Sequence, residues 1–305
     1  EKIEPWRFDE ARNRALSHVP EDVDICVSND IDEVFEPGWR KKLEDAWTKD
    51  ATRARYLFTC EYNEDGTPKK QFGMEKIHSR HGYKWVHPVH EVLKYDGEIP
   101  EKTIWINGLV LNHYPDITKP RSQYLPLLEI SAKENPDDDR GMFWLGREYM
   151  FYGQWDNSIK TLKHYLSMPT AVWNEERCAA MRYIGRCYER KGDKEQAKIW
   201  YFRAVAECPH VREPYLDFAM FGYFAKDWHL VMAMTLEALK ITKSTGSYLV
   251  EPKAWGFTFH DLAALSMYHL DMRKQAYIHA KAAYEMEPNN ERLKNNMLLL
   301  KKGAE

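Results

Sequence analysis

The sequence predicts an α/β layer domain over residues 1–122, followed by an all-helical repeat domain over residues 123–305. Three observations predict this division. Short β-like runs alternate with brief helical periodicity up to about residue 115, the strand signals fade after Pro136, and a recurring pattern of small and aromatic residues then begins. A chain of 305 residues also fits two domains, at roughly 150 residues each.

In the first part, β-like runs and amphipathic helices alternate. The strands we expect are 24–27, 54–60 and 103–111, with a turn at 64–68. One helix places Phe8, Ala11, Ala15 and Leu16 on a single face. A second helix follows the Pro37-Gly38 break, and its apolar face carries Trp39, Leu43, Ala46 and Trp47. This alternation predicts an α/β layer domain.

The second part repeats one motif of small, aromatic and turn residues. A copy runs from Tyr183-Ile-Gly185 to Pro209, an earlier one surrounds Trp144-Leu-Gly146, and Ala219 lies 34 residues after Gly185. A further copy contains Ala264, Ala276, Ala280, Ala283 and Pro288. Over about 139–290 this pattern resembles tetratricopeptide repeats, which stack helical hairpins into a superhelix. We also expect an insertion near 170–174 and a capping helix within 289–305.

Composition excludes several classes of protein. There are 44 basic and 47 acidic residues, interspersed to a net charge of −3, so no basic stripe favours nucleic acid. The apolar runs are far shorter than the ~20 residues of a membrane-spanning helix. Five scattered cysteines without a CxxC pair favour reduced thiols, and no secretory signal is visible, so we expect a cytoplasmic location.

Two carboxylates follow the predicted strand at 24–27. Asp30 and Asp32 lie one residue apart at its carboxyl end, where open α/β sheets place ligands. Oxygen ligands at this spacing suit Mg²⁺ or Mn²⁺. The same spacing recurs at Asp22 and at Asp137, so it is weak evidence by itself. The alternative is an acidic turn that caps the next helix.

Arg12 falls in the apolar stripe of the first helix, between Phe8 and Leu16. A guanidinium there needs an anionic partner, which could be Asp30 or a diphosphate beside it. The alternative is that Arg12 extends to the surface and only its stem packs.

A third group surrounds the run from Tyr83 to Glu91. We discount zinc, because His87-x-x-His90 contains Pro88 and lacks the helical His-Glu-x-x-His pattern. Glu91 could act as a general base if desolvation raises its pKa; a salt bridge with Lys84 or Lys94 is the alternative. Tyr83, Trp85 and His87 could form a stacking wall for a sugar, or could simply pack in the core.

Four motifs occur in a fixed order: Phe8-x-x-Ala-Arg-Asn13, Asp30-x-Asp-Glu33, Val89-His-Glu91 and Leu111-x-His-Tyr114. Over about 5–125 this order resembles family-2-type glycosyltransferases with the GT-A fold, including those that carry tetratricopeptide repeats. The resemblance implies a sugar donor bound through Mn²⁺ or Mg²⁺. It also implies that the sheet is Rossmann-like but truncated, because the first βαβ portion of that family would lie before Glu1, and that this chain is therefore a fragment of a longer enzyme.

The resemblance also implies roles for individual residues. Asp30, Asp32 and His113 would hold the metal, and Glu91 would be the base of an inverting displacement. The nucleotide-sugar donor would be bound by Arg12, Asn13, Asp30, Lys119 and Arg121. The hydroxyl acceptor, a glycan, a lipid-linked glycan or a protein, would lie against Tyr83, Trp85 and His87.

Two functions from different classes follow. The first is a metal-dependent glycosyltransferase that moves a sugar from a nucleotide sugar to a hydroxyl acceptor. The second is a non-catalytic repeat scaffold that binds a peptide or protein partner, or associates with itself, through its helical array. The two differ in which half of the chain carries the function.

Overall fold

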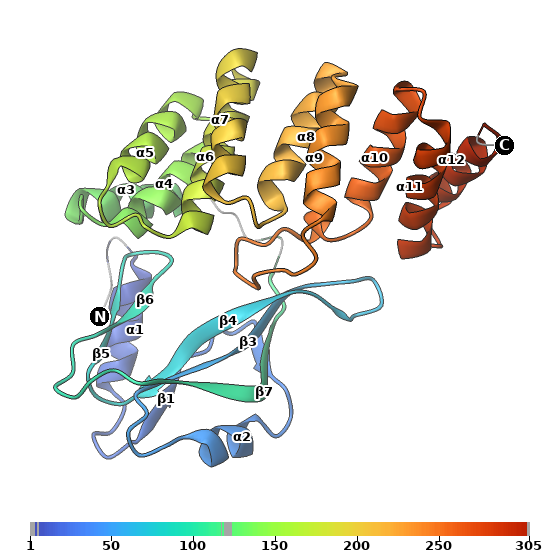
Figure 1. The fold of residues 1–305 in the computed structure, drawn as a ribbon. Coiled ribbons are helices and arrows are strands. Elements are labelled where there is room, and N and C mark those ends of the chain that lie inside the picture. Colours follow the sequence, from blue (N-terminus) through green and yellow to red (C-terminus); the bar gives the residue numbers. More distant parts are fainter. Residues whose placement is uncertain (1–3, 5, 117, 119–123, 304–305) are drawn as a thin grey trace. The chain divides into compact units, whose positions relative to one another are not determined.

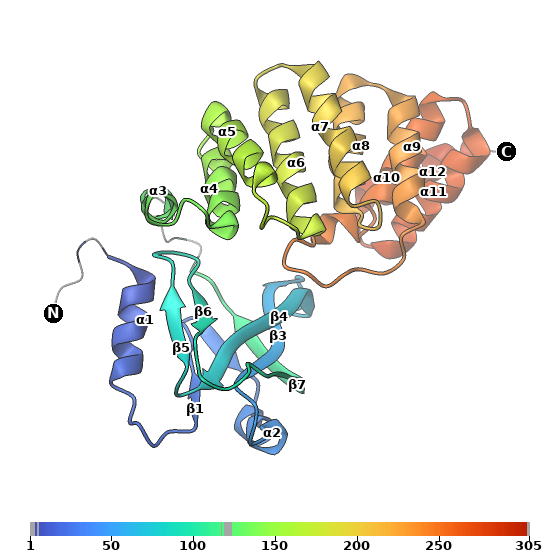
Figure 2. The ribbon, with the colours of Figure 1, turned by 60° about the vertical axis from the view of Figure 1, so that its left-hand side comes forward.

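A computed structural model describes residues 4, 6–116, 118 and 124–303 of the chain. Its internal contacts divide the chain into two compact units. Unit 1 runs to Glu148 and also takes in Gly246–Tyr248, and unit 2 comprises Tyr149–Thr245 and the chain from Leu249 onward. Figures 1 and 2 show the mixed sheet of unit 1 and the row of helices of unit 2. This division falls inside a helix, whereas the sequence-based boundary lies at 122/123, and that boundary stays a prediction.

Unit 1 contains a sheet with helices beside it. Its elements are α1 (Phe8–Ser17), β1 (Ile25–Val27), β2 (Glu33–Phe35), α2 (Trp39–Ala46), β3 (Arg53–Tyr62), β4 (Pro68–Ser79), β5 (Tyr83–Val86), β6 (Val92–Tyr95), β7 (Thr103–His113), α3 (Tyr124–Glu134) and α4 (Asp139–Phe151). The predicted strands correspond to β1, β3 and β7, and the predicted helices to α1 and α2.

The main sheet has the strand order β1-β4-β3-β7-β2 and is mostly antiparallel. Among the described strands, β3 and β7 form the one parallel pair, in which Phe58 lies opposite Leu111. The long β3–β4 hairpin pairs Phe58 with Phe72. β1 is an edge strand that pairs with β4 alone, so its carboxyl end does not lie at the edge of a parallel sheet.

The core of unit 1 lies on the face of the sheet that α2 covers. Tyr56 from β3 and Leu109 and Leu111 from β7 are almost fully buried there. Trp39 and Leu43 of α2 pack against them, as the apolar face of that helix predicts. The four-residue β5 and β6 form a separate ribbon, and α1 packs beside β5.

Unit 2 is an array of helical hairpins. Its elements are α5 (Trp155–Ser167), α6 (Asn174–Arg190), α7 (Lys194–Glu207), α8 (Glu213–Ala225), α9 (Trp228–Leu239), the short η1 (Pro252–Ala254), α10 (Thr258–His269), α11 (Arg273–Met286) and α12 (Glu291–Lys302). The helices of each hairpin, α6–α7, α8–α9 and α10–α11, stand side by side (Figure 1). These hairpins confirm the predicted helical repeats, and α12 confirms the capping helix.

The turns between paired helices share one backbone geometry. Each contains a left-handed residue: Gly153, Gly192, Lys226 or Asp271. The next residue then donates its backbone N–H to the carbonyl five positions earlier, at 2.8–2.9 Å in all four turns. This bond is the helix-ending motif that glycine favours. Because two turns use lysine or aspartate instead, the glycine spacing in the sequence reveals only part of the repeat.

Close helix packing explains the small residues of the repeat. A Cβ added at Gly185 of α6 would lie 2.7 Å from the buried Tyr201 ring of α7. Ala197 and Ala204 of α7 are fully buried. The connection between α5 and α6 (168–173) contains the predicted insertion. A longer connection, between Leu239 of α9 and Thr258 of α10, was not predicted.

In the part of the chain that the structure describes, no helix is long and apolar enough to cross a membrane.

Candidate functional site

A cleft of about 740 Å³ in unit 1 gathers several of the predicted residues. Its walls come from α1, the loop after β1, strands β3 and β4, the loop before β6 and the end of β7. They include Arg12, Asp30, Asp32, Lys76, Glu91 and His113. The motifs that are far apart in the sequence are therefore brought together.

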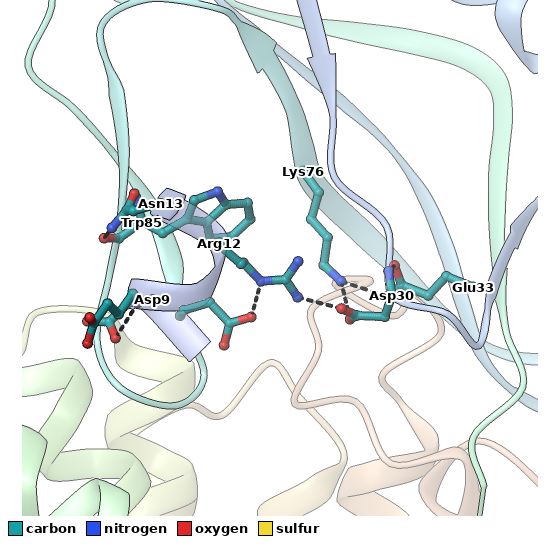
Figure 3. Close-up of polar contacts among 9 residues, drawn as sticks. Asp9, Arg12, Asn13, Asp30, Glu33, Lys76 and Trp85 are labelled. Carbon is teal, nitrogen blue, oxygen red and sulfur yellow. Dashed lines mark hydrogen bonds and ion pairs between the residues drawn. The ribbon is translucent and has the colours of Figure 1, made fainter. Parts of the chain in front are cut away.

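Arg12 lies at the centre of a charged cluster in this cleft. Its Nε donates to Glu91 Oε1 at 2.5 Å, and its Nη2 donates to Asp30 Oδ1 at 2.5 Å (Figure 3). The guanidinium also lies over the Trp85 ring, 4.8 Å from its centre. Of the two partners considered from the sequence, the structure provides Asp30, and Glu91 is a second carboxylate partner. Glu91 pairs with neither Lys84 nor Lys94 among the described contacts.

Lys76 also reaches Asp30, from above in the view of Figure 3, whereas Arg12 reaches it from the left. Its Nζ donates to Asp30 Oδ2 at 2.9 Å and to Glu33 Oε1 at 2.6 Å. Burial by itself would raise the pKa of Asp30, but Lys76 and then Arg12 outweigh burial, and the pKa lies below its ordinary value. Both carboxylate oxygens of Asp30 thus bind cationic side chains of the protein.

Asn13 fixes the helix α1 against β5. Its side-chain amide donates to the Trp85 carbonyl and accepts from the Trp85 backbone N–H, both at 2.8 Å. Trp85 and Tyr83 are buried in a cluster with Leu93 and Tyr95, so both rings act as core side chains of the β5–β6 ribbon. His87 lies beyond the ribbon, with its Nδ1 3.4 Å from Asp138.

Asp32 and His113 lie next to each other at the end of β7. The distance from His113 Nε2 to Asp32 Oδ2 is 3.6 Å, and the imidazole stacks on the Phe58 ring. Among the described residues, however, no group of three or more His, Cys, Asp or Glu side chains is placed to hold a metal ion. Lys119 and Arg121 lie outside the described residues.

Sequence reasoning missed Lys76 and the role of Glu33. Lys76 lies in β4 at an irregularity of the pairing with β3, where Ala54 pairs with Ile77 and Tyr56 with Met74. Because one extra residue interrupts the alternation there, the sequence pattern does not tell which face Lys76 occupies. Glu33, with a side chain 3% exposed, also accepts the backbone N–H of Asp30 at 2.9 Å. The cluster therefore holds the loop after β1 in place.

Unit 2 contains a second charged cluster, on the first helices of its hairpins. Arg182 and Arg186 of α6 both bind Asp217 of α8 and Glu251 of the α9–α10 connection. Arg182 is only 2% exposed. Burial would raise the pKa of Glu251, but the two arginines lower it to about 2.

The α9–α10 connection makes further bonds in unit 2. Glu213 of α8 accepts from the Glu251 backbone N–H at 3.1 Å and from the Trp255 indole at 3.0 Å. Arg212 donates to the Ile241 carbonyl at 2.8 Å, and its guanidinium lies over the Trp255 ring. Ala254 is fully buried against α8 and α10 residues. This connection therefore fills the face that α6, α8 and α10 share.

The fold of unit 2 defines a helical repeat protein of the tetratricopeptide type. Solved structures similar to this chain include the MamA protein (16% identity, TM-score 0.43, covering 56% of this chain and 85% of that one). The Cut9–Hcn1 hetero-tetramer of the APC/C is another, with 13% identity and a TM-score of 0.45, covering 60% of this chain and 33% of that one. A third is pilF of Pseudomonas aeruginosa, with 10% identity and a TM-score of 0.43, covering 56% of this chain and 70% of that one. No family model and no curated protein matches the chain.

These findings correct the identification of the chain as a family-2-type glycosyltransferase. No family model and no curated protein ties the chain to that family. The repeat architecture is established by the hairpins of the structure itself. In unit 1 the antiparallel surroundings of β1 also differ from the open parallel sheet that the resemblance implied.

The predicted glycosyltransferase activity is corrected together with this identification, because it rested on that resemblance. The Asp30-x-Asp32 pair loses its interpretation as a metal-binding motif, because Asp30 is occupied by Arg12 and Lys76. A bound Mn²⁺ or Mg²⁺ and the individual site roles stay predictions.

Proposed function

We propose that this chain is a non-catalytic, tetratricopeptide-like scaffold that binds a peptide or protein partner, or a second copy of itself, through the helices of unit 2. The observation that carries this proposal is the distribution of exposed apolar side chains. Most of those in unit 2 occur in pairs, one position or one helical turn apart, whereas Tyr268, Ile278 and Met286 stand singly. The pairs are Phe151–Tyr152, Val172–Trp173, Ile199–Phe202, Tyr223–Phe224 and Leu298–Leu299. Isolated exposed apolar residues are common on any surface, whereas clustered ones mark interaction sites.

The repeat architecture supports the proposal. Stacked hairpins extend in one direction and expose a long surface relative to their volume, which is how such arrays contact partners. The charged cleft of unit 1 supports it less directly, because its carboxylates and cations already neutralise one another within the protein.

Two measurements on the full chain test this function. Sedimentation velocity over a range of concentrations detects self-association, and selection from a random-peptide display library detects peptide ligands. We expect the chain to self-associate, to bind selected peptides, or both. The association or binding should weaken in at least one of three double variants: Ile199→Ser/Phe202→Ser, Tyr223→Ser/Phe224→Ser or Leu298→Ser/Leu299→Ser.

The matched control is Trp105→Ser, which removes a similarly exposed aromatic side chain from unit 1. A chain that stays monomeric at every concentration and selects no peptide would contradict the proposed function. So would association that responds to Trp105→Ser and to none of the unit 2 variants.

A further inference from the structure

Aromatic rings at two neighbouring hairpin turns of unit 2 form a continuous ladder. Phe224 contacts Tyr223 edge-on, and Tyr223 contacts Trp228 in the same way, with ring centres 5.3 and 6.2 Å apart. Trp228 then stacks flat on His269, with centres 4.0 Å apart and planes 6° from parallel. His269 meets Tyr268 at 5.5 Å. The ladder thus spans the α8–α9 and α10–α11 turns.

The ladder lies at one edge of the array, because each of its members ends the first helix of a hairpin or begins the second. Figure 1 shows the hairpin turns of α6–α7, α8–α9 and α10–α11 along the same edge. Phe224 is 69% exposed, and Tyr223 and Tyr268 are each more than one-third exposed. Large aromatic rings that pack on one another and still face water offer a preformed, rigid apolar surface.

Charge at this edge is uneven. Asp227 caps α9 through the Leu230 backbone N–H, and Asp271 binds Arg273, whose guanidinium lies 4.2 Å from the centre of the Tyr268 ring. The carboxylates of the edge are thereby engaged. The exposed Lys226 stands beside Phe224 in the chain, and the exposed Lys274 follows Arg273. Positive charge therefore flanks the two ends of an aromatic row.

The face that α6, α8 and α10 share does not offer an alternative. Glu251, Ala254 and Trp255 of the chain's own α9–α10 connection occupy it, and Ala254 is fully buried. A ligand there would have to displace a packed segment, whereas the edge is open.

We propose that this aromatic edge, formed by Tyr223, Phe224, Trp228, Tyr268 and His269, binds an extended acidic peptide segment that carries prolyl or aromatic residues. The inference rests on the proposed scaffold function and names its site and partner chemistry. Rings in a row accept the flat faces of proline and aromatic side chains, as aromatic-lined surfaces do for extended peptides. Carboxylates beside those residues meet Lys226 and Lys274 at the two ends.

A membrane surface is the other chemistry that aromatic and basic residues favour. The edge fits it less well, because its rings stack on one another instead of projecting separately into a lipid layer.

The test selects peptides on the full chain from a random display library and measures the binding of synthetic copies by fluorescence polarisation. We expect selected sequences enriched in Asp or Glu beside Pro or aromatic residues. Binding should fall at least tenfold in Phe224→Ser/Tyr268→Ser and several-fold in Lys226→Glu/Lys274→Glu, and it should weaken as salt rises. The matched control, Ile278→Ser/Met286→Ser, changes similarly exposed apolar residues of α11 and should bind as the unmodified chain does.

The outcomes separate this inference from the function on which it rests. Peptides that bind equally to the control and to both edge variants would overturn the aromatic edge and leave the scaffold function standing. No selected peptide and no self-association would overturn both. Edge-dependent co-sedimentation with vesicles of phosphatidylcholine and phosphatidylserine, without peptide binding, would replace the peptide by a membrane. A second variant, His269→Gln, opens the stack on Trp228 without removing an apolar side chain, and circular dichroism verifies the fold of each variant.

Discussion

The charged clusters of the two units share their chemistry and differ in their access to water. In unit 1, Arg12 is 17% exposed and its partner Asp30 is 42% exposed beside an open cleft. In unit 2, Arg182 is 2% exposed and its partner Asp217 is 10% exposed. Charge pairs gain strength as water is removed, but each buried member then depends on the other. The difference indicates that the unit 2 cluster is structural, whereas the unit 1 cluster can rearrange.

Removing Arg182, the most buried charge of the two clusters, should show the difference between them most clearly. Arg182→Met leaves Asp217 and Glu251 close together with Arg186 as their remaining partner. We expect unfolding free energy to fall by about 3 kcal/mol, since an uncompensated buried charge is costly. Urea unfolding followed by circular dichroism measures the loss, because most helices belong to unit 2. Arg190→Met, at the exposed end of the same helix, should change it by less than about 0.5 kcal/mol.

Glu251 should make the stability of the unit 2 cluster depend on pH. Its folded pKa is about 2, below its ordinary value of 4.5. A lowered pKa stabilises the fold above the unfolded pKa, and this contribution is lost as the pH falls from about 4.5 toward 2. After allowance for partial exposure, we expect about 2 kcal/mol of stability to be lost in this window. Glu251→Gln should abolish that part of the pH dependence, and an unchanged profile would show that the cluster is not ionised as described.

A substitution that disturbs apolar packing in unit 2 provides a reference for these charge effects, because it changes no ionisable group. Gly185→Ala would bring a Cβ within 2.7 Å of the Tyr201 ring, and we expect a loss of about 2 kcal/mol through overpacking. This loss should be independent of pH between 2 and 7, in contrast to that of Glu251. Gly256→Ala is the control, since its nearest neighbouring atom would be 3.9 Å away. A pH-dependent loss in Gly185→Ala would mean that acid sensitivity is a general property of the array.

We expect the smallest loss of unfolding free energy from a substitution in the unit 1 cluster. Arg12→Met should cost only about 1 kcal/mol, because Lys76 still binds Asp30, and Glu91, which loses its partner, lines the open cleft where water can reach it. Arg40→Met, which removes an exposed pair with Glu44, should change the stability least and sets the baseline. Thermal unfolding of both variants measures the difference. A loss as large as that of Arg182→Met would remove the distinction between the two clusters.

The sequence predicted the local elements better than the way they assemble. Apolar periodicity located α1 and α2, although of the two only α2 buries a residue of its predicted apolar face, Leu43, whereas the buried residue of α1 is Asp9. It missed β4, which opens with Pro68-Lys69-Lys70 and has an irregular pairing between Met74 and Ile77, so that alternation is masked. The pairing of β1 with β4 is a non-local choice that no short motif encodes. The expectation that Asp30 follows a strand of an open parallel sheet was wrong at this step.

The charged clusters show the same limit. The position of Arg12 in an apolar stripe predicted an anionic partner, and Asp30 is one. The cationic partner of Asp30, Lys76, was missed because its strand was missed. In unit 2, Arg182 binds Glu251, which lies in the α9–α10 connection that interrupts the repeat pattern. Repeat analysis describes only what recurs, so it did not predict this pair.

The three residues Gly246–Tyr248 belong by their contacts to unit 1, although the chain on both sides belongs to unit 2. Tyr248 stacks on Trp144 with ring planes 16° apart, about one hundred residues away in sequence. Closing so long a loop carries an entropic cost that must be met before the contact forms, and such contacts slow folding. Unit 1 is therefore completed only after most of unit 2 has been synthesised, and a fragment ending at Glu148 would lack one of its aromatic side chains.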